Sequence, residues 1–198
     1  MPAIRSVCVY AGSSPGADPA YAAAARAMGA EIARRGWEMV YGGGTVGLMG
    51  IAADAALAGG APVTGIIPAA LHAREIGKVD LTELIVVETM HERKFLMAER
   101  SDAFAALPGG VGTIEELVEA LTWTQLGIHS KPVGLLDTAG YWAPLAAMMD
   151  AARDARFVRP EHRALLLSAP EPAALLDALV AWEPLALDTW RDGGPPGI

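Results

Sequence analysis

Short apolar runs, each followed by a stretch with helical periodicity, constrain the fold of this chain most strongly. The runs have no regular alternation of polar and apolar residues, so we expect strands that are buried on both faces, as in a parallel sheet. Because helical stretches separate them, the sequence predicts a single-domain, doubly wound α/β fold: a Rossmann-like, mostly parallel sheet flanked by helices. The expected strands are Ile4–Tyr10, Trp37–Tyr41, Pro62–Ile67, Leu84–Val87, Ala103–Leu107 and Val133–Leu136.

The stretch after the first strand carries clear helix-capping signals. Asp18 is a favoured N-cap residue, and Pro19 suits the first helical position. Gly36 is typical of the residue that ends a helix. Further helices are expected up to about Gly59, over 90–100, over 114–126, and after the last of the strands.

The length suits one domain with a proper core. The chain has 198 residues and shows no internal repeat or linker, so we expect one domain over residues 1–185. The segment Asp192–Gly197 is rich in Gly and Pro. Residues 186–198 are therefore expected to form a flexible tail.

Charge and cysteine content limit which partners the protein can bind and which cellular compartment suits it. Fifteen Lys and Arg against 23 Asp and Glu give a net charge of −8, which argues against a nucleic acid or an anionic membrane as partner. The uncharged stretch 55–73 is broken by Gly and Pro, so we expect no membrane helix. The single cysteine, Cys8, excludes an internal disulfide and a Cys-based zinc cage. With no secretory signal at the N-terminus, a cytoplasmic location is predicted.

Three loops rich in Gly or Ser follow expected strands. They span residues 11–16, 42–47 and 108–113. Ligands of doubly wound sheets bind beyond the carboxyl ends of the strands, so the three loops should open onto one edge and form the site. Ser13, Gly43 and Gly44 are candidates for contacts with a phosphate or a ribose.

The third loop, Pro108–Gly112, precedes a helix. Its glycines allow backbone N–H groups to approach an anion, and the helix start adds free N–H groups and a positive dipole end, so phosphate is the expected guest. Thr113-x-x-Glu116 also matches a capping box, in which Glu116 would bind the Thr113 amide. The alternative is that Glu116 faces ribose hydroxyls or a sugar cation.

Arg93 and Lys94 lie near the start of the helix expected over 90–100. Cations there oppose the helix dipole, so a functional demand for positive charge would explain them. The alternative is that Glu92 and Glu99 neutralise them on a solvated face.

Several motifs match only in part. The second loop matches G-x-G-x-x-G, but the next strand ends in Ile67-Pro68, without the acidic residue of a dinucleotide site. The first loop matches G-x-S-x-G, but Pro15 has no N–H for an oxyanion hole, which argues against a serine hydrolase. The four histidines are scattered, so no metal site is expected.

Met90-x-x-Arg93-Lys94 combined with Pro108-Gly-Gly-x-Gly-Thr-x-x-Glu116 resembles the LOG family. These are cytokinin riboside 5′-monophosphate phosphoribohydrolases, often labelled as a lysine decarboxylase family. The resemblance includes 42–50 and 122–136 and runs from the first strand to about residue 160. It implies hydrolysis of the N-glycosidic bond of N6-modified adenosine 5′-monophosphates, and of AMP, to free base and ribose 5-phosphate.

The resemblance also implies site residues and a partner. Arg93 and Glu116 would be catalytic. A homodimer with sites near the subunit interface is implied, and the stretch around Trp123 and Leu126 suits either that interface or the core. No cofactor is expected. With the loop candidates, the expected substrate contacts are Ser13, Gly43, Gly44, Glu75, Lys94, Gly109, Gly110, Val111, Gly112, Thr113, Ile114, Glu115 and Thr122.

The residue types at the expected site are consistent with this hydrolysis, but alternative roles and functions stay open. A helix N-terminus should keep Glu116 ionised, which favours an electrostatic role over strong basicity and leaves the activator of water open. Decarboxylation would require pyridoxal phosphate on a lysine, and Lys94 has no identifiable pyridinium partner. The alternatives are a non-catalytic nucleotide- or molybdenum-cofactor-binding module and a broader nucleoside-monophosphate nucleosidase.

Overall fold

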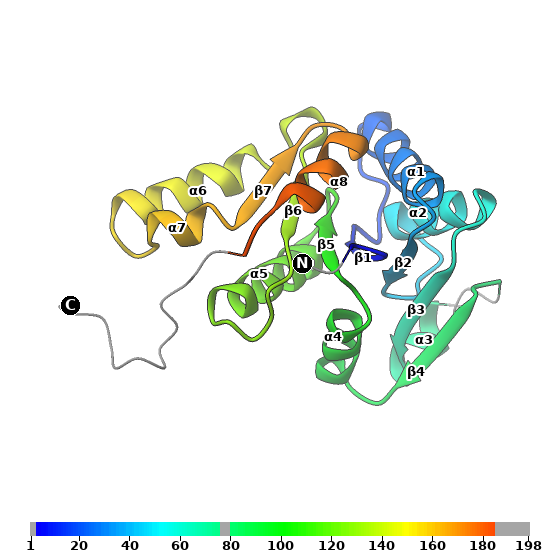
Figure 1. Ribbon diagram of the computed structural model, residues 1–198. Helices are drawn as coiled ribbons and strands as arrows, with labels where there is room; N and C mark the ends of the chain where they lie inside the picture. Colours follow the sequence, from blue (N-terminus) through cyan, green and yellow to red (C-terminus); the bar gives the residue numbers. More distant parts are fainter. Residues whose placement is uncertain (1–2, 76–79, 185–198) are drawn as a thin grey trace.

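The computed structural model describes residues 3–75 and 80–184. In this part of the chain, one sheet contains seven strands in the order β4-β3-β2-β1-β5-β6-β7, and neighbouring strands pair in parallel. The predicted fold class is confirmed (Figure 1). The strands are β1 (Ser6–Tyr10), β2 (Glu38–Tyr41), β3 (Val63–Pro68), β4 (Glu83–Val87), β5 (Ala103–Ala106), β6 (Val133–Leu136) and β7 (Leu166–Ala169).

Helices cover both faces of the sheet. Figure 1 shows α4 and α5 on the side opposite α1, α2 and α8. The expected cap of α1 is confirmed, because the Asp18 carboxylate accepts a hydrogen bond from the Ala20 amide at 2.8 Å. The helices are α1 (Pro19–Arg34), α2 (Gly47–Ala58), α3 (Ala69–Glu75), α4 (Met90–Glu99), α5 (Val111–Gln125), α6 (Ala143–Asp154), α7 (Pro160–Arg163) and α8 (Pro172–Ala181), with a short 3-10 helix η1 (Thr138–Gly140).

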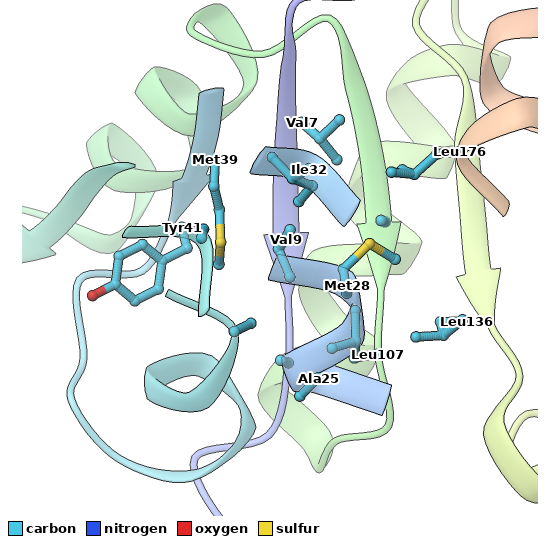
Figure 2. Close-up of a cluster of buried hydrophobic side chains, with 14 of the residues drawn as sticks. Val7, Val9, Ala25, Met28, Ile32, Met39, Tyr41, Leu107, Leu136 and Leu176 are labelled. Atoms are coloured by element: carbon cyan, nitrogen blue, oxygen red, sulfur yellow. The ribbon is translucent and has the colours of Figure 1, made fainter. Parts of the chain in front are cut away.

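The central strand β1 contributes to a core on each face, which explains its lack of alternation. Val7 and Val9 pack with Met28 and Ile32 of α1, as Figure 2 shows. Cys8 and the neighbouring Tyr10 belong to the cluster on the other face, with residues of α4 and α5. Side chains on both faces of such a strand must be apolar.

Strand β7 was not predicted. The residues Ala164–Leu167 are strong helix formers, and α7 directly precedes them. Leu166–Ala169 nevertheless pair with Val133–Leu136 of β6, so tertiary pairing overrides local propensity here.

The sheet topology fixes where a ligand crevice can form. Strands β1 and β5 are neighbours, yet the chain continues from β1 toward β2 and from β5 toward β6, in opposite directions across the sheet. The carboxyl ends of β1 and β5 therefore flank the topological switch point, where open α/β sheets bind ligands.

Two expectations about the chain as a whole have different outcomes. No helix among the described residues is long and apolar enough to cross a membrane. One sheet and its helices account for the described residues up to 184, and the predicted tail 186–198 lies outside them.

Candidate functional site

The three Gly- and Ser-rich loops meet at the carboxyl edge of the sheet, as predicted. The Gly12 amide of the first loop donates to the Pro108 carbonyl of the third loop at 3.0 Å. The Leu48 amide, just after the second loop, donates to the Gly12 carbonyl at 2.9 Å. A side chain at Gly47 would lie 2.3 Å from the carbonyl carbon of Ser13, so glycine is required for the loops to pack.

Helix α5 begins at the third loop with an open N-terminus. Its N-cap, Gly110, supplies no side-chain hydrogen bond, and residues 110–112 are exposed. The first N–H groups of a helix have no intrahelical partner, and the dipole favours an anion there. The expected phosphate position is thus available at the start of α5.

Of the two interpretations of Glu116, the capping box is wrong. Helix α5 starts at Val111 rather than at Ile114, so Thr113 is already its third residue. Thr113 is buried against Gly109, where an added Cβ would lie 2.1 Å from the Thr113 hydroxyl oxygen. Glu116 lies nearly one turn further along α5 and faces Arg93 instead.

Arg93 extends from α4 to the ends of two strands. Its Nε donates to the Ile66 carbonyl of β3 at 3.1 Å, and its Nη2 donates to the Gly42 carbonyl, just after β2, at 3.5 Å. A Cβ built at Gly42 would lie 1.8 Å from Arg93 Nη2. The glycine at position 42 therefore makes the space that the guanidinium occupies.

The solvated-face alternative for this basic pair is wrong. Arg93 and Lys94 are both buried, and the first turn of α4 uses Glu92 for capping. The Thr89 hydroxyl accepts from the Glu92 amide at 3.1 Å, and the Glu92 carboxylate accepts from the Glu88 amide at 3.0 Å. The interpretation that Arg93 serves a site is the one that the geometry supports.

Arg93 and Glu116 form the central charged pair. Arg93 Nη2 lies 3.7 Å from Glu116 Oε1, and the two side chains are 10% and 12% exposed. Burial raises the pKa of Glu116 to about 7, although the Arg93 guanidinium acts to lower it. A carboxyl group with this pKa exchanges its proton near neutral pH.

The expectation that Glu116 stays ionised at a helix N-terminus is therefore wrong. Glu116 is the sixth residue of α5, and the effect of the helix dipole fades beyond the first turn. Desolvation of the carboxylate between α5 and Arg93 outweighs what remains of it.

Lys94 points to α5 rather than to the open helix start. Its ammonium group binds the carboxylates of Glu115 and Glu119, the second at 3.0 Å. Burial opposes the charge of Lys94, but these two hydrogen-bonded carboxylates outweigh it and raise the Lys94 pKa. The expected contact of Lys94 with a substrate stays a prediction.

The remaining expected contacts divide into two groups. Ser13, Gly43, Gly44 and the residues 109–114 lie on the converging loops or at the start of α5. Thr122 lies further along α5, where its exposed hydroxyl donates to the Val118 carbonyl at 2.7 Å. Glu75 is the last residue of α3, and its side chain lies outside the described part of the structure. All of these contacts stay predictions.

Helix α5 also presents an apolar stripe to solvent, which we call the α5 stripe. It consists of Val111, Ile114 and Val118, spaced for one face of a helix, and Val111 is 85% exposed. Leu126, at the end of the helix, is also exposed. Trp123 instead is partly buried, packing against the core and edge-on to His129, so the core accounts for part of its surface. A role of Trp123 in a dimer interface stays a prediction.

Tyr141 is a further residue at this site, and it was not predicted from the sequence. Its hydroxyl donates to the Gly109 carbonyl of the third loop at 2.5 Å. The contact joins residues 32 positions apart, and no local pattern in the sequence could have indicated it. Among the described residues, no group of three or more His, Cys, Asp or Glu side chains could hold a metal ion.

Comparison with protein families and curated proteins gives consistent matches. A family model described as "possible lysine decarboxylase" matches residues 49–179. The chain is 48% identical over 180 residues to the probable cytokinin riboside 5′-monophosphate phosphoribohydrolase LOGL2 of Oryza sativa subsp. japonica, covering 91% of this chain and 74% of that protein. It is 47% identical over 180 residues to the cytokinin riboside 5′-monophosphate phosphoribohydrolase LOG7 of Arabidopsis thaliana, covering 91% and 83%.

Solved structures share the fold at lower identity. The molybdenum cofactor carrier protein of Chlamydomonas reinhardtii superimposes with a TM-score of 0.67 at 21% identity, covering 89% of this chain and 98% of that one. The molybdenum cofactor binding protein of Rippkaea orientalis gives 0.63 at 23% identity, covering 87% and 93%. At these identities the similarity extends to the fold alone.

Proposed function

The chain belongs to the LOG family, and on that premise we propose that it hydrolyses the N-glycosidic bond of N6-modified adenosine 5′-monophosphates. The products are the free base and ribose 5-phosphate, and AMP is a further substrate. The observation that carries the proposal is the buried Arg93–Glu116 pair at 3.7 Å, two residues from different helices that meet beside the open start of α5.

In this proposal, the start of α5 holds the 5′-phosphate. The exposed N–H groups at 110–112 and the dipole of α5 suit a phosphate, and the first and second loops lie alongside. Ser13, Gly43 and Gly44 supply further contacts from these loops. Holding the phosphate fixes the ribose, which lowers the entropic part of the barrier.

Glu116 then serves as the general base. Its pKa of about 7 lies near a neutral working pH, where a base is most effective. A water oxygen bonds to the ribose C1′ as the C1′–N bond breaks, and a proton of that water passes to the Glu116 carboxylate. The same carboxylate stabilises positive charge on the sugar in an oxocarbenium-like transition state.

Arg93 has the complementary role. Its guanidinium is held by the carbonyls of Ile66 and Gly42, so its position is fixed before substrate binds. From there it orients the nucleotide and stabilises negative charge that develops on the departing base. The base takes a proton from solvent water to leave neutral, and Glu116 returns the proton that it accepted to solvent. Lys94, Glu115 and Thr122 belong to the proposed set of nucleotide contacts.

A homodimer is part of the proposal. The α5 stripe exposes apolar side chains at one helix spacing, next to residues assigned to substrate binding. A second copy that covers this stripe would remove it from water and bring a second α5 close to the site. Thr122, on the exposed side of α5, would then lie near the interface.

Two other functions are less well supported. A pyridoxal-dependent decarboxylase needs a lysine that gives up its proton, whereas the carboxylates of Glu115 and Glu119 raise the pKa of Lys94. The cofactor-binding proteins of similar structure share the fold alone, and a pure binding module has no need of a buried Glu116 with a raised pKa. A cytoplasmic location stays a prediction.

The proposal is tested by incubating the protein with isopentenyladenosine 5′-monophosphate and with AMP, followed by chromatography for released base. Base release is expected from both, with kcat/KM rising with pH and levelling off above about 7. Glu116→Gln should release base at a greatly reduced rate. Tight nucleotide binding without base release would instead favour the binding module.

A further inference from the structure

Tyr141 connects the turn after β6 to the third loop, which precedes α5. The residue follows η1, in the connection after β6, and its hydroxyl donates to the Gly109 carbonyl at 2.5 Å. Gly109 precedes Gly110, the N-cap of α5. The tyrosine therefore acts on the peptide group that leads into the open helix start.

The turn that presents Tyr141 is strained. Ala139 has φ 55° and ψ 27°, a left-handed conformation that non-glycine residues rarely adopt, and Gly140 follows with φ 72°. The Asp137 carboxylate holds the turn closed by accepting from the Trp142 amide at 2.7 Å, and the Trp142 side chain is buried. Strain of this kind persists where the surrounding structure imposes it, often at functional sites.

A second tyrosine extends the connection to the first loop. The rings of Tyr21 and Tyr141 pack edge to face with centroids 5.6 Å apart. The Tyr21 ring lies against Gly16, where an added Cβ would be 2.7 Å from it. The two rings thus join the loop 11–16 to the loop 108–113 at a place separate from the Gly12–Pro108 hydrogen bond.

We propose that Tyr141 is a positioning residue that fixes the orientation of the Gly109–Gly110 peptide for phosphate binding. The described peptide bonds are trans, so the carbonyl oxygen and the following N–H point in opposite directions. When the Tyr141 hydroxyl holds the Gly109 oxygen on one side, the Gly110 N–H must point to the other side. The inference rests on the proposed function, because it assumes that the ligand at the start of α5 is a phosphate.

Tyr141→Phe tests this role, because it keeps the ring contacts with Tyr21 and Trp142 and removes only the hydroxyl. Calorimetry measures the Kd for ribose 5-phosphate, for inorganic phosphate and for adenine. One hydrogen bond corresponds to a rise of about 2- to 12-fold in Kd for the two phosphate ligands. The Kd for adenine should stay within about 2-fold, since no hydrogen bond to the base is lost.

Tyr41→Phe is the matched control. The Tyr41 hydroxyl is fully buried and has no hydrogen-bond partner among the described residues, so its removal should leave all three Kd values unchanged. An equal rise for phosphate ligands and adenine, or no rise for either, overturns the positioning role. If Tyr141→Phe weakens phosphate binding while the wild-type protein releases no base from any nucleotide, the positioning role is upheld and the proposed function is refuted. Failure of the wild type to bind phosphate refutes both.

Discussion

Gly42→Ala tests the position of Arg93 separately from its chemistry, since it replaces neither of the two proposed catalytic residues. The Cβ of an alanine at position 42 would lie 1.8 Å from Arg93 Nη2, whereas ordinary van der Waals contact begins at 3.4 Å. Gly42 is not among the glycines with positive φ, so alanine brings no backbone strain of its own. The guanidinium must therefore retreat by about 1.6 Å, the difference between these two distances.

The expected effect on catalysis is large. A displacement of this size breaks the bonds to the Gly42 and Ile66 carbonyls and changes the 3.7 Å contact with Glu116. Misplacing a catalytic group by about 1 Å can reduce the rate on the order of 100-fold, so kcat/KM should fall by about that factor. Because Arg93 acts to lower the pKa of Glu116, the midpoint of the pH–rate profile should move above 7.

Steady-state kinetics across pH 5 to 9 measure both effects, and a thermal melt controls for overpacking, which typically costs about 1–3 kcal/mol. Gly134→Ala is the matched control, because its Cβ would lie 2.6 Å from Leu175 Cδ1 in the core, away from Arg93. The control should lose stability and keep its kcat/KM and its pH midpoint. Wild-type kcat/KM in Gly42→Ala would refute the assignment of Arg93 to catalysis.

Three further predictions use the same geometry. Burial raises the pKa of Glu116 from 4.5 to about 7, so the stability that the Glu116 carboxyl contributes is complete below pH 4.5 and is lost as pH rises through 7. Glu116→Gln should avoid this loss of about 3 kcal/mol in the free energy of unfolding, measured by urea melts at pH 8. Equal pH dependence of stability in both proteins would contradict this prediction. Val118→Arg should convert the proposed homodimer into folded monomers in sedimentation velocity, because it places a charge on the α5 stripe, and an unchanged mass would exclude this interface. Gly112→Ala should stabilise α5 by about 0.5–1 kcal/mol and raise KM for the nucleotide, whereas an unchanged KM would remove Gly112 from the phosphate site.

The fold could be predicted because its information is local. Strands such as β1 are apolar on both faces, and caps such as Asp18 mark helix ends within a few residues. Where the deciding contact is distant in sequence, the predictions were wrong or missing. Leu166–Ala169 became a strand because β6 lies beside it, and α5 begins three residues before the predicted start because its N-cap is Gly110, not Thr113.

The site was predictable in its residue types but not in its electrostatics. Helix position alone indicated an ionised Glu116, while burial beside Arg93 decides its pKa. The partners of the site residues are also remote in sequence. Gly42 lies 51 residues from Arg93, and Tyr141 lies 32 residues from Gly109. Neither spacing belongs to any helical or strand period that a sequence pattern could reveal.

The glycines of the three loops differ in what a side chain would meet, and this difference supports the proposed position of the ligand. At Gly42, Gly47 and Gly109 an added Cβ would lie within 2.8 Å of protein atoms, so packing within the chain accounts for these glycines. At Gly110 and Gly112 it would meet no described atom within 4 Å, and neither residue has a positive φ. Neither crowding nor a left-handed backbone therefore requires glycine at these two positions. A group from outside the chain that approaches the backbone closely does give a reason for glycine, and at the positive end of α5 that group should be an anion.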